Sequence, residues 1–395
     1  MKNDAVDTAG RQSRRLAAVQ APVIPIVGRW TAETPGTISL GQGVVSYEPP
    51  REAIEAARRF GGALTDHRYG PVEGLPPLVE AIEVKLAREN RIAVKPHSRV
   101  LVTAGGNQAF MNAVLAITDS DDEIVLLVPY YFNHEMAVVM AGAKAVAVPT
   151  TSDYQLDVHA IEAAITPRTR AVVTVSPNNP TGAVYPEAAL RAVNALCRDR
   201  GVFHIHDEAY EYFTYGDARH FSPPSIPGSE EHTIGLYSLS KAYGMAGWRI
   251  GYMVIPAHLE ESIKKIQDTN LICPPILNQL AAEAALSAGR NWCQERILPF
   301  AGVRDLVLSE LAKLGDHLRV PTPGGAFYAL MKVNTPRTDM DLVESLIRNH
   351  AIAVMPGSTF AAGDGCYLRI AYGALDRDTV AEGMGRLVRG LHALL

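Results

Sequence analysis

The chain has 395 residues, of which 47% are hydrophobic and 20% are charged. This balance is typical of a globular protein with two or three domains, and it excludes a disordered chain. The formal net charge is -5, with 37 Lys and Arg against 42 Asp and Glu; because binding to phosphate backbones needs a basic excess, no nucleic-acid partner is expected.

The segment up to residue 30 is polar and charged, and Pro22 and Pro25 interrupt it. It lacks the continuous apolar stretch of a secretion signal. Charges or prolines also interrupt each apolar stretch that might cross a bilayer, so no membrane partner is expected. The four cysteines are scattered without a CxxC motif, which indicates reduced thiols rather than disulfides. We therefore predict a cytoplasmic protein.

Short apolar runs through the middle of the chain predict buried strands, at residues 99–103, 123–128, 144–148, 170–175, 202–207, 233–238 and 249–254. Amphipathic stretches between several of them predict helices, at residues 107–117, 157–165 and 186–200. Nearly continuous apolar strands that alternate with helices indicate an α/β fold. Its sheet is expected to be mostly parallel, with helices on both faces.

The pattern changes after about residue 298. Helices are predicted at residues 299–314 and 339–349, on either side of the segment RVPTPGGAFYALMKV, and the strand pattern CYLRIAYG precedes a C-terminal helix. These elements predict a second, smaller α+β domain. We assign residues 45–295 to the large domain and residues 1–44 with 296–395 to the small one.

The segment SLSKAYGMAGWRIGY places Lys241 directly after a predicted strand, among small and apolar residues. A lysine in such a neighbourhood is costly to keep charged. A solvated loop position is the simpler interpretation of a lone lysine. This chain, however, also contains the partners that a lysine bound to pyridoxal phosphate (PLP) requires, namely a carboxylate for the pyridine nitrogen and anchors for the phosphate.

Polar groups follow three other predicted strands. Asp207 ends the strand VFHIHD, and α/β sheets place their ligands at the carboxyl ends of such strands. The glycine pair of TAGGNQAF stands between a strand and a helix, where free backbone N–H groups suit a phosphate. Most glycine pairs are merely turns. The loop SPNNPTG has the same two interpretations, a turn or an Asn that bonds a cofactor hydroxyl.

The motifs SPNNPTG, DEAY and SLSKAYGMAGWRIGY, in this order and spacing, resemble those of the class I/II aminotransferase family, which are PLP enzymes of fold type I. The resemblance runs from about residue 40 to residue 373 and is highly specific. It implies that the cofactor is pyridoxal 5'-phosphate and that the chain is an aminotransferase.

The resemblance also implies the catalytic residues. Lys241 matches the lysine that forms the Schiff base with the cofactor, and Asp207 matches the carboxylate that pairs with the pyridinium nitrogen. Tyr210 resembles the tyrosine that bonds the 3'-oxygen of the cofactor. Asn179 resembles the other partner of that oxygen and a contact of the substrate.

The remaining implied residues bind the phosphate, the ring or the substrate. The phosphate ligands implied are Gly106, Asn107, Ser238 and Arg249, and Gly105 and Ser240 are also expected to bind the cofactor. Tyr131 resembles the aromatic residue that stacks on the pyridine ring, and Arg369 the arginine that grips the substrate α-carboxylate in a bidentate pair. Gly43 stands where the family's backbone touches the substrate. Tyr69 matches a tyrosine that reaches the phosphate of the neighbouring subunit, so a homodimer with shared active sites is expected.

Two other interpretations of short motifs are weaker. The GQG of residues 41–43 is half of a dinucleotide-binding fingerprint, but it lacks the third glycine and the strand–helix context. His204 and His206 precede Asp207 and could face one side of a strand toward a metal ion. No second ligand cluster appears at a suitable spacing, so no metal is expected. His206 is expected near the cofactor or in the core.

The predicted reaction is transfer of an amino group from an L-amino acid to a 2-oxo acid, in ping-pong half-reactions that use Lys241. The alternative is a PLP enzyme of the same fold that performs β- or γ-elimination, cyclisation or oxidation, because these reactions share the deprotonation of Cα. A ligand-binding domain of a regulator is less favoured, because no helix-turn-helix pattern precedes residue 40.

The prediction of the substrate class depends on the position of one acidic residue. By position, Asp268 falls where family members selective for dicarboxylates carry an arginine, in an alignment that rests on a CPP tripeptide. An acidic group there would repel a second carboxylate, so a neutral, aromatic or basic amino acid is expected rather than a dicarboxylic one. Tyr130, Phe132, Phe327 and Tyr328 could line an apolar pocket or belong to the core.

Overall fold

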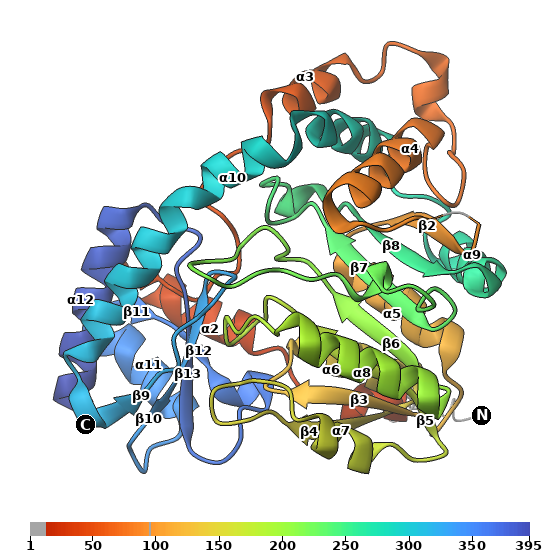
Figure 1. The fold of residues 1–395 in the computed structure, drawn as a ribbon. Helices are drawn as coiled ribbons and strands as arrows, with labels where there is room; N and C mark the ends of the chain where they lie inside the picture. The colour runs from red at the N-terminus through yellow and green to blue at the C-terminus, as the bar shows by residue number, and fades with distance from the viewer. Residues whose placement is uncertain (1–12, 95) are drawn as a thin grey trace, which may run out of the picture.

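The computed structural model describes residues 13–94 and 96–395. Within this range the largest sheet has seven strands in the order β2-β8-β7-β6-β5-β3-β4 (Figure 1). Their bounds are β2 Ser98–Thr103, β3 Glu123–Val128, β4 Lys144–Pro149, β5 Thr169–Val175, β6 Phe203–Asp207, β7 Thr233–Ser238 and β8 Gly251–Pro256. Strand β8 runs antiparallel to both β2 and β7, whereas the other neighbouring pairs are parallel. The predicted α/β fold with a mostly parallel sheet is confirmed.

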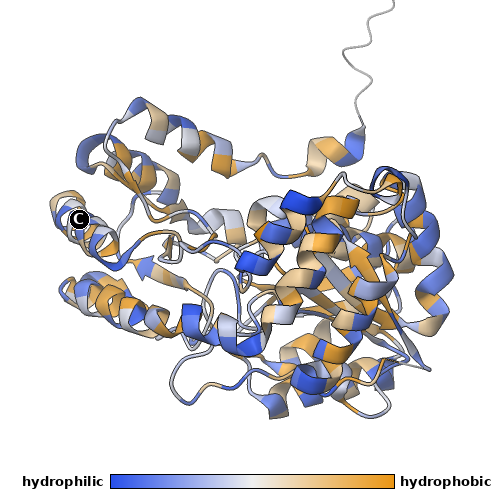
Figure 2. Ribbon diagram, turned by 90° about the horizontal axis from the view of Figure 1, so that it is seen from above, coloured by the Kyte–Doolittle hydropathy of each residue, from blue (hydrophilic) through white to orange (hydrophobic). Residues whose placement is uncertain are grey.

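Helices cover both faces of this sheet because its strands are apolar on both sides. Leu126 of β3 packs in a core cluster with residues of α5 (Gly106–Ile117), α6 (Phe132–Ala141) and α9 (Glu260–Asn270). Val125 and Leu127, its neighbours, belong to the cluster with α7 (Val158–Ala164) and α8 (Glu187–Arg200). Successive strand residues point to opposite faces, and in Figure 2 the strands at the centre of the larger lobe are mostly hydrophobic.

Helix α10 (Ile276–Ala312) is longer than the helix predicted at residues 299–314. It bends at Gly289, whose φ is 74° and ψ is -179°, and it carries Pro299 in its interior. It runs from beside α3 (Arg51–Arg59) and α4 (Pro76–Lys85) to α12 (Arg377–Leu394), as Figure 1 shows. None of the helices in the described residues combines the length and apolar character that a bilayer crossing requires.

A second group of elements contains an antiparallel sheet in the order β12-β13-β10-β9. The bounds are β9 Leu318–Arg319, β10 Tyr328–Val333, β12 Met355–Pro356 and β13 Cys366–Ala371, with helix α11 at Asp339–His350. Strand β1 (Ile38–Ser39) pairs in parallel with β11 (Ile352–Ala353), so an early segment of the chain joins the late elements.

The N-terminal part of the described chain contributes α1 (Arg14–Ala18) and α2 (Val23–Glu33). Helix α2 packs against α11, while α1 packs against α6 of the larger sheet. Residues 1–12, which the sequence assigns to the small domain, lie outside the described residues. The boundary expected between residues 295 and 296 falls inside α10.

Candidate active site

A cavity of about 770 Å³ lies at the carboxyl ends of β5, β6 and β7 and is closed by residues of α2, β10 and β13. Most of the residues predicted for the site line it: Gly43, Gly106, Asn107, Tyr131, Asn179, Asp207, Tyr210, Ser238, Ser240, Lys241, Arg249 and Arg369. Two predicted residues do not. Gly105 stands just behind the lining, and the side chain of Tyr69 is 83% exposed at the surface.

Lys241 follows β7 and projects into the cavity, where its Nζ donates to the carbonyl oxygen of Gly43. The hydroxyl of Tyr47 fixes the backbone beneath it by donating to the carbonyl oxygens of Lys241 and Ala242, at 3.1 Å each. Burial, together with the positive charge of Arg369, lowers the pKa of Lys241 to about 8. The amine is therefore partly neutral near physiological pH, which is the state that a nucleophile or base requires.

Asp207 ends β6 and is 9% exposed. Its Oδ1 accepts from the backbone N–H of Ala209 at 3.0 Å, and its Oδ2 lies 3.2 Å from Nε2 of His134. His134, on α6, is buried and stacks on Phe110 with ring centroids 4.0 Å apart. Sequence reasoning missed His134, because no motif surrounds it and its contact with Asp207 arises only from tertiary packing.

The start of α5 and the turn after β7 form a concave, anion-binding end of the cavity. Gly105 has a φ of 85°, and a methyl group there would collide with Nη2 of Arg249. The first N–H groups of a helix such as α5 have no partner inside the helix and carry partial positive charge. Ser238 accepts from the N–H of Ser240 at 3.1 Å, and both line the cavity. Backbone amides, hydroxyls and one guanidinium fit the phosphate of PLP.

Arg369 is a buried cation without a carboxylate partner in the described part of the chain. Its Nη1 donates to Oδ1 of Asn179 at 3.0 Å and its Nη2 to the carbonyl oxygen of Gly41 at 2.6 Å. Among the described residues its Nε has no hydrogen-bond partner. A buried guanidinium that carboxylates leave uncompensated is costly, so the arrangement suits capture of an anionic group from the cavity.

The aromatic residues divide between cavity and core. Phe132 and Tyr328 line the cavity, whereas Phe327 is fully buried and Tyr130 does not reach it. Tyr131 lies edge-on to His134, with ring centroids 5.3 Å apart. Sequence reasoning missed a further apolar group on the substrate side of the cavity, which consists of Ile24, Val27, Val44 and Met355.

The histidine pair on β6 does not converge on a metal-binding position. Oγ1 of Thr174 lies 2.7 Å from Nε2 of His204 and 2.6 Å from Nδ1 of His206, and all three residues are fully buried. Burial lowers the pKa of His204 to about 3 and moves the pKa of His206 in the same direction. Both rings are therefore neutral hydrogen-bonding groups of the core, which is one of the two places expected for His206.

Another cluster brings Glu208, Glu211 and His220 within 4.8 Å of one another. Its carboxylates already have partners, since Nζ of Lys85 lies 2.5 and 2.6 Å from the two Glu211 oxygens and Tyr237 donates to Glu208 at 2.8 Å. Lys85 thus already neutralises Glu211, while His220 and Ser222 also contact Glu208.

Asp268 lies exposed on α9 and is not among the residues that line the cavity of this chain. Asp268 therefore does not place a negative charge in the cavity of its own subunit. Within one subunit, a preference against a second carboxylate depends on the residues that do line the cavity.

A partly neutral lysine, a buried carboxylate and an anion-binding end, gathered at one edge of a parallel sheet, define a PLP-dependent enzyme of fold type I. The family model for class I and II aminotransferases matches residues 35–387. An aromatic aminotransferase of Arabidopsis thaliana is 36% identical to this chain and covers 98% of both. An aspartate aminotransferase of Pyrococcus abyssi is 34% identical over 90% of this chain and 91% of its own.

Among solved structures, the aspartate aminotransferase from Thermus thermophilus with maleate has a TM-score of 0.88 at 33% identity, over 96% of this chain and 99% of that one. The chain belongs to the class I and II aminotransferase family. It is a PLP-dependent aminotransferase, and its reactants are small-molecule amino acids and 2-oxo acids. The relatives named above are all aminotransferases, so the alternative of elimination, cyclisation or oxidation is not favoured.

Proposed function

We propose that this aminotransferase uses L-amino acids with neutral or aromatic side chains rather than dicarboxylic ones. The observation that carries the proposal is the set of cations in the cavity. Among the described lining residues these are Lys241, Arg249 and Arg369, without a further Lys, Arg or His. Each of the three has a role with the cofactor or the α-carboxylate, so a second carboxylate would find no further cation among the described lining residues.

The apolar lining supports the same substrate class. Ile24, Val27, Phe132 and Met355 surround the substrate side of the cavity. Transfer of an aromatic side chain to such a surface is favourable by about 25 cal/mol per Å² of apolar area. For a basic side chain, also expected from the sequence, the described lining offers Asp207 as its one acidic group, and that carboxylate is assigned to the pyridine nitrogen. The names of the relatives include both aromatic and aspartate aminotransferases, and the composition of the cavity supports the aromatic class.

The cofactor would be held by residues from both ends of the cavity. Gly105, Gly106, Asn107, Ser238, Ser240 and Arg249 would bind its phosphate. Asp207, fixed by Ala209 and His134, would keep the pyridine nitrogen protonated. Tyr131 would stack on the ring, and Tyr210 with Asn179 would bond the 3'-oxygen.

When bound, PLP supplies an electron-withdrawing ring that accepts the electron pair of the broken Cα–H bond. Lys241 would anchor the cofactor, and its amine, once free, would take the Cα proton of the substrate and later give it up again. Its pKa of about 8 allows both directions of proton transfer near neutral pH. Arg369 holds the α-carboxylate with Asn179 alongside, and the backbone of Gly43 borders the substrate.

We also propose a homodimer, a cytoplasmic location and the division into residues 45–295 and residues 1–44 with 296–395. The exposed ring of Tyr69 supports the dimer, because it would be available to the phosphate site of a partner subunit. All four cysteines are free and buried, which supports a reducing compartment.

The test is a half-reaction with purified protein, added PLP and a panel of amino acids without an acceptor. Visible spectra and product masses are recorded together, with Lys241→Ala as the inactive control. Phenylalanine or tyrosine should convert the cofactor to its amine form and release the matching 2-oxo acid, at a rate well above that of aspartate. A product that has lost a side-chain fragment or gained oxygen would overturn the reaction, and faster conversion by aspartate would overturn the substrate class.

A further inference from the structure

We propose that Tyr328 is a positioning residue whose hydroxyl and ring serve two different groups of the active site. The hydroxyl orients Tyr210 toward the cofactor, and the ring supports the guanidinium of Arg369. The inference rests on the proposed function, because that function gives Tyr210 and Arg369 their roles. Tyr328 comes from β10, so it joins the late antiparallel sheet to residues that follow β6.

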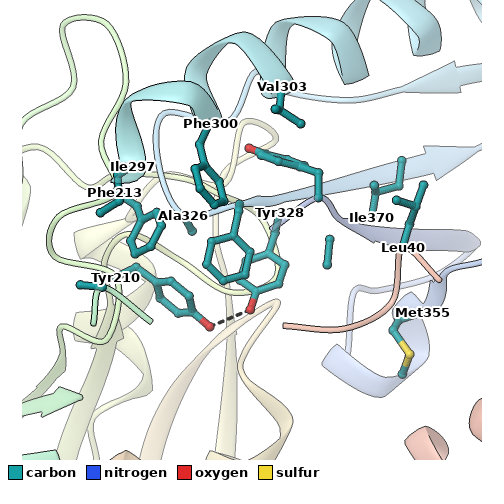
Figure 3. Packing of buried hydrophobic residues seen from close by; sticks show 14 of the residues in the cluster. Leu40, Tyr210, Phe213, Ile297, Phe300, Val303, Ala326, Tyr328, Met355 and Ile370 are labelled. Carbon is teal, nitrogen blue, oxygen red and sulfur yellow. Dashed lines mark hydrogen bonds between the residues drawn. The ribbon is translucent and has the colours of Figure 1, made fainter. Parts of the chain in front are cut away.

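The hydroxyl of Tyr328 lies 2.8 Å from that of Tyr210, and both side chains are buried. Figure 3 shows the two rings meeting at this bond. In the described part of the chain neither hydroxyl has another hydrogen-bond partner. Each tyrosine has one proton to donate. If Tyr210 donates its proton to the cofactor oxygen, its own oxygen must accept from Tyr328, which fixes the direction of both bonds.

The backbone of Gly43 packs closely against the hydroxyl of Tyr328. A methyl group at residue 43 would collide with the hydroxyl oxygen of Tyr328. The carbonyl oxygen of Gly43 in turn accepts from Nζ of Lys241. The Tyr328 hydroxyl therefore lies against the backbone of Gly43, which accepts the hydrogen bond of the lysine. A displacement of Tyr328 would thus also move the hydrogen-bond partner of the reacting amine.

The ring of Tyr328 forms one side of a sandwich around Arg369. Cζ of Arg369 lies 4.8 Å from the ring centroid of Tyr328 and 4.8 Å from that of Phe360. Aromatic faces attract a guanidinium, and more strongly where water is excluded. Because Arg369 lacks a carboxylate partner in the described residues, the two rings take part of the role of a counter-ion. They also hold in place the planar group whose Nη atoms donate to Asn179 and Gly41.

Two substitutions separate the functions of the side chain. Tyr328→Phe removes the hydroxyl and keeps the ring, whereas Tyr328→Leu removes both. Phe327→Leu is the matched control, because Phe327 is equally buried and packs on Tyr210 at 5.5 Å between centroids but has neither the hydroxyl nor the contact with Arg369. Thermal unfolding of each holoenzyme shows how much of any effect comes from lost packing.

The readout for the hydroxyl is the pKa of the bound cofactor, followed by its visible absorption as pH is varied. The titratable groups around Tyr210 are Tyr131, Asp207, Tyr328 and Lys241, and Tyr328→Phe changes one of them. A weaker bond from Tyr210 leaves more negative charge on the cofactor oxygen, which stabilises the neighbouring protonated nitrogen. Tyr328→Phe should therefore raise this pKa by about half a unit or more, and leave the KM for amino donors within about twofold.

The readout for the ring is the KM. Tyr328→Leu should raise the KM for amino donors by about 3- to 30-fold relative to Tyr328→Phe, with a smaller effect on kcat. A wild-type cofactor pKa in Tyr328→Phe would overturn the role of the hydroxyl. A KM in Tyr328→Leu no higher than in Phe327→Leu would overturn the role of the ring. Failure of the wild-type protein to bind PLP would instead overturn the proposed function, and this inference with it.

Discussion

Substitution of Arg369 by methionine should separate substrate binding from folding. Methionine fills the space between the rings of Tyr328 and Phe360 and keeps an unbranched shape, but it offers no donors to a carboxylate. Removing one partner of a buried, hydrogen-bonded charge pair costs about 2–5 kcal/mol. At about 1.4 kcal/mol per factor of ten, this predicts roughly 30- to 5,000-fold weaker binding of any α-carboxylate ligand.

The same substitution should change stability little when no substrate is present. It removes two hydrogen bonds from a charged group, to Asn179 and Gly41, each worth about 1.5–3 kcal/mol. It also removes a buried cation whose desolvation, several kcal/mol in order of magnitude, no carboxylate of the described chain offsets. The two effects oppose each other, so the free energy of unfolding should stay within about 2 kcal/mol of wild type.

The assay titrates a non-reactive monocarboxylate such as 3-phenylpropanoate against the visible spectrum of the holoenzyme, and measures urea unfolding in parallel. Arg304→Met is the matched control. Arg304 also lies over an aromatic ring, that of Tyr215 at 5.2 Å, but it lies outside the cavity lining. A loss of affinity in Arg369→Met of less than about threefold, or one equal to that of the control, would refute the reasoning.

Three further predictions follow from the structure. Gly105→Ala introduces a clash with Arg249 at a residue whose φ is 85°. Because backbone strain of this kind costs about 1–3 kcal/mol, the variant should bind PLP about tenfold more weakly. Dialysis at graded PLP concentrations measures this affinity, and an unchanged affinity would contradict the prediction. The pKa of Lys241 is lowered to about 8, so the neutral fraction of its amine should rise about tenfold per pH unit below pH 8 and level off above it. The rate of PLP uptake by the apoprotein should follow this fraction when measured by stopped-flow absorbance from pH 6 to 9.5. A rate that does not change with pH would contradict the lowered pKa. Lys85→Met should destabilise the protein by about 3–5 kcal/mol, because it removes the buried cation that pairs with Glu211, whose side chain is only 11% exposed. Urea unfolding should show that Lys85→Met with Glu211→Leu recovers at least half of the loss, and no recovery would contradict the role of this ion pair.

The sequence predicts that Lys241, Asp207 and Arg249 lie together, because each stands next to a strong local signal. Lys241 and Asp207 come immediately after apolar strands, and Arg249 lies in the same motif as Lys241. Parallel strands place their carboxyl ends at one edge of a sheet. Once the strands are predicted correctly, their arrangement in the sheet is enough to bring these residues together.

The substrate end could not be predicted in the same way, because it is made by contacts between distant segments. His134 reaches Asp207 only through the packing of α6, and Tyr328 reaches Tyr210 from β10. The lining residues of α2 recur at helical spacing, but periodicity shows which face is buried and not what it faces. Pro25 also obscured this helix, although a proline in the first turn is tolerated.

Helix α10 contains two local signals for an interruption, and only one of them interrupts it. Gly289 and Pro299 are ordinary signals of this kind, and the predicted helix starts only at residue 299. Gly289 does break the helical geometry, with a φ of 74° and a ψ of -179°, whereas Pro299 lies inside a helical stretch, and α3, α4 and α12 pack along α10. Tertiary contacts outweigh the local preference here.

The bond from Arg369 to the carbonyl of Gly41 joins residues 328 positions apart. Because synthesis proceeds at about 5–20 residues per second, roughly 16 to 66 seconds separate their emergence from the ribosome. All seven strands of the sheet that carries Lys241 are synthesised within that interval, before β11 is available to pair with β1. The residues that would hold the cofactor can thus assemble before the residues that would hold an amino acid. Affinity for substrate therefore requires early and late segments of the chain to have come together.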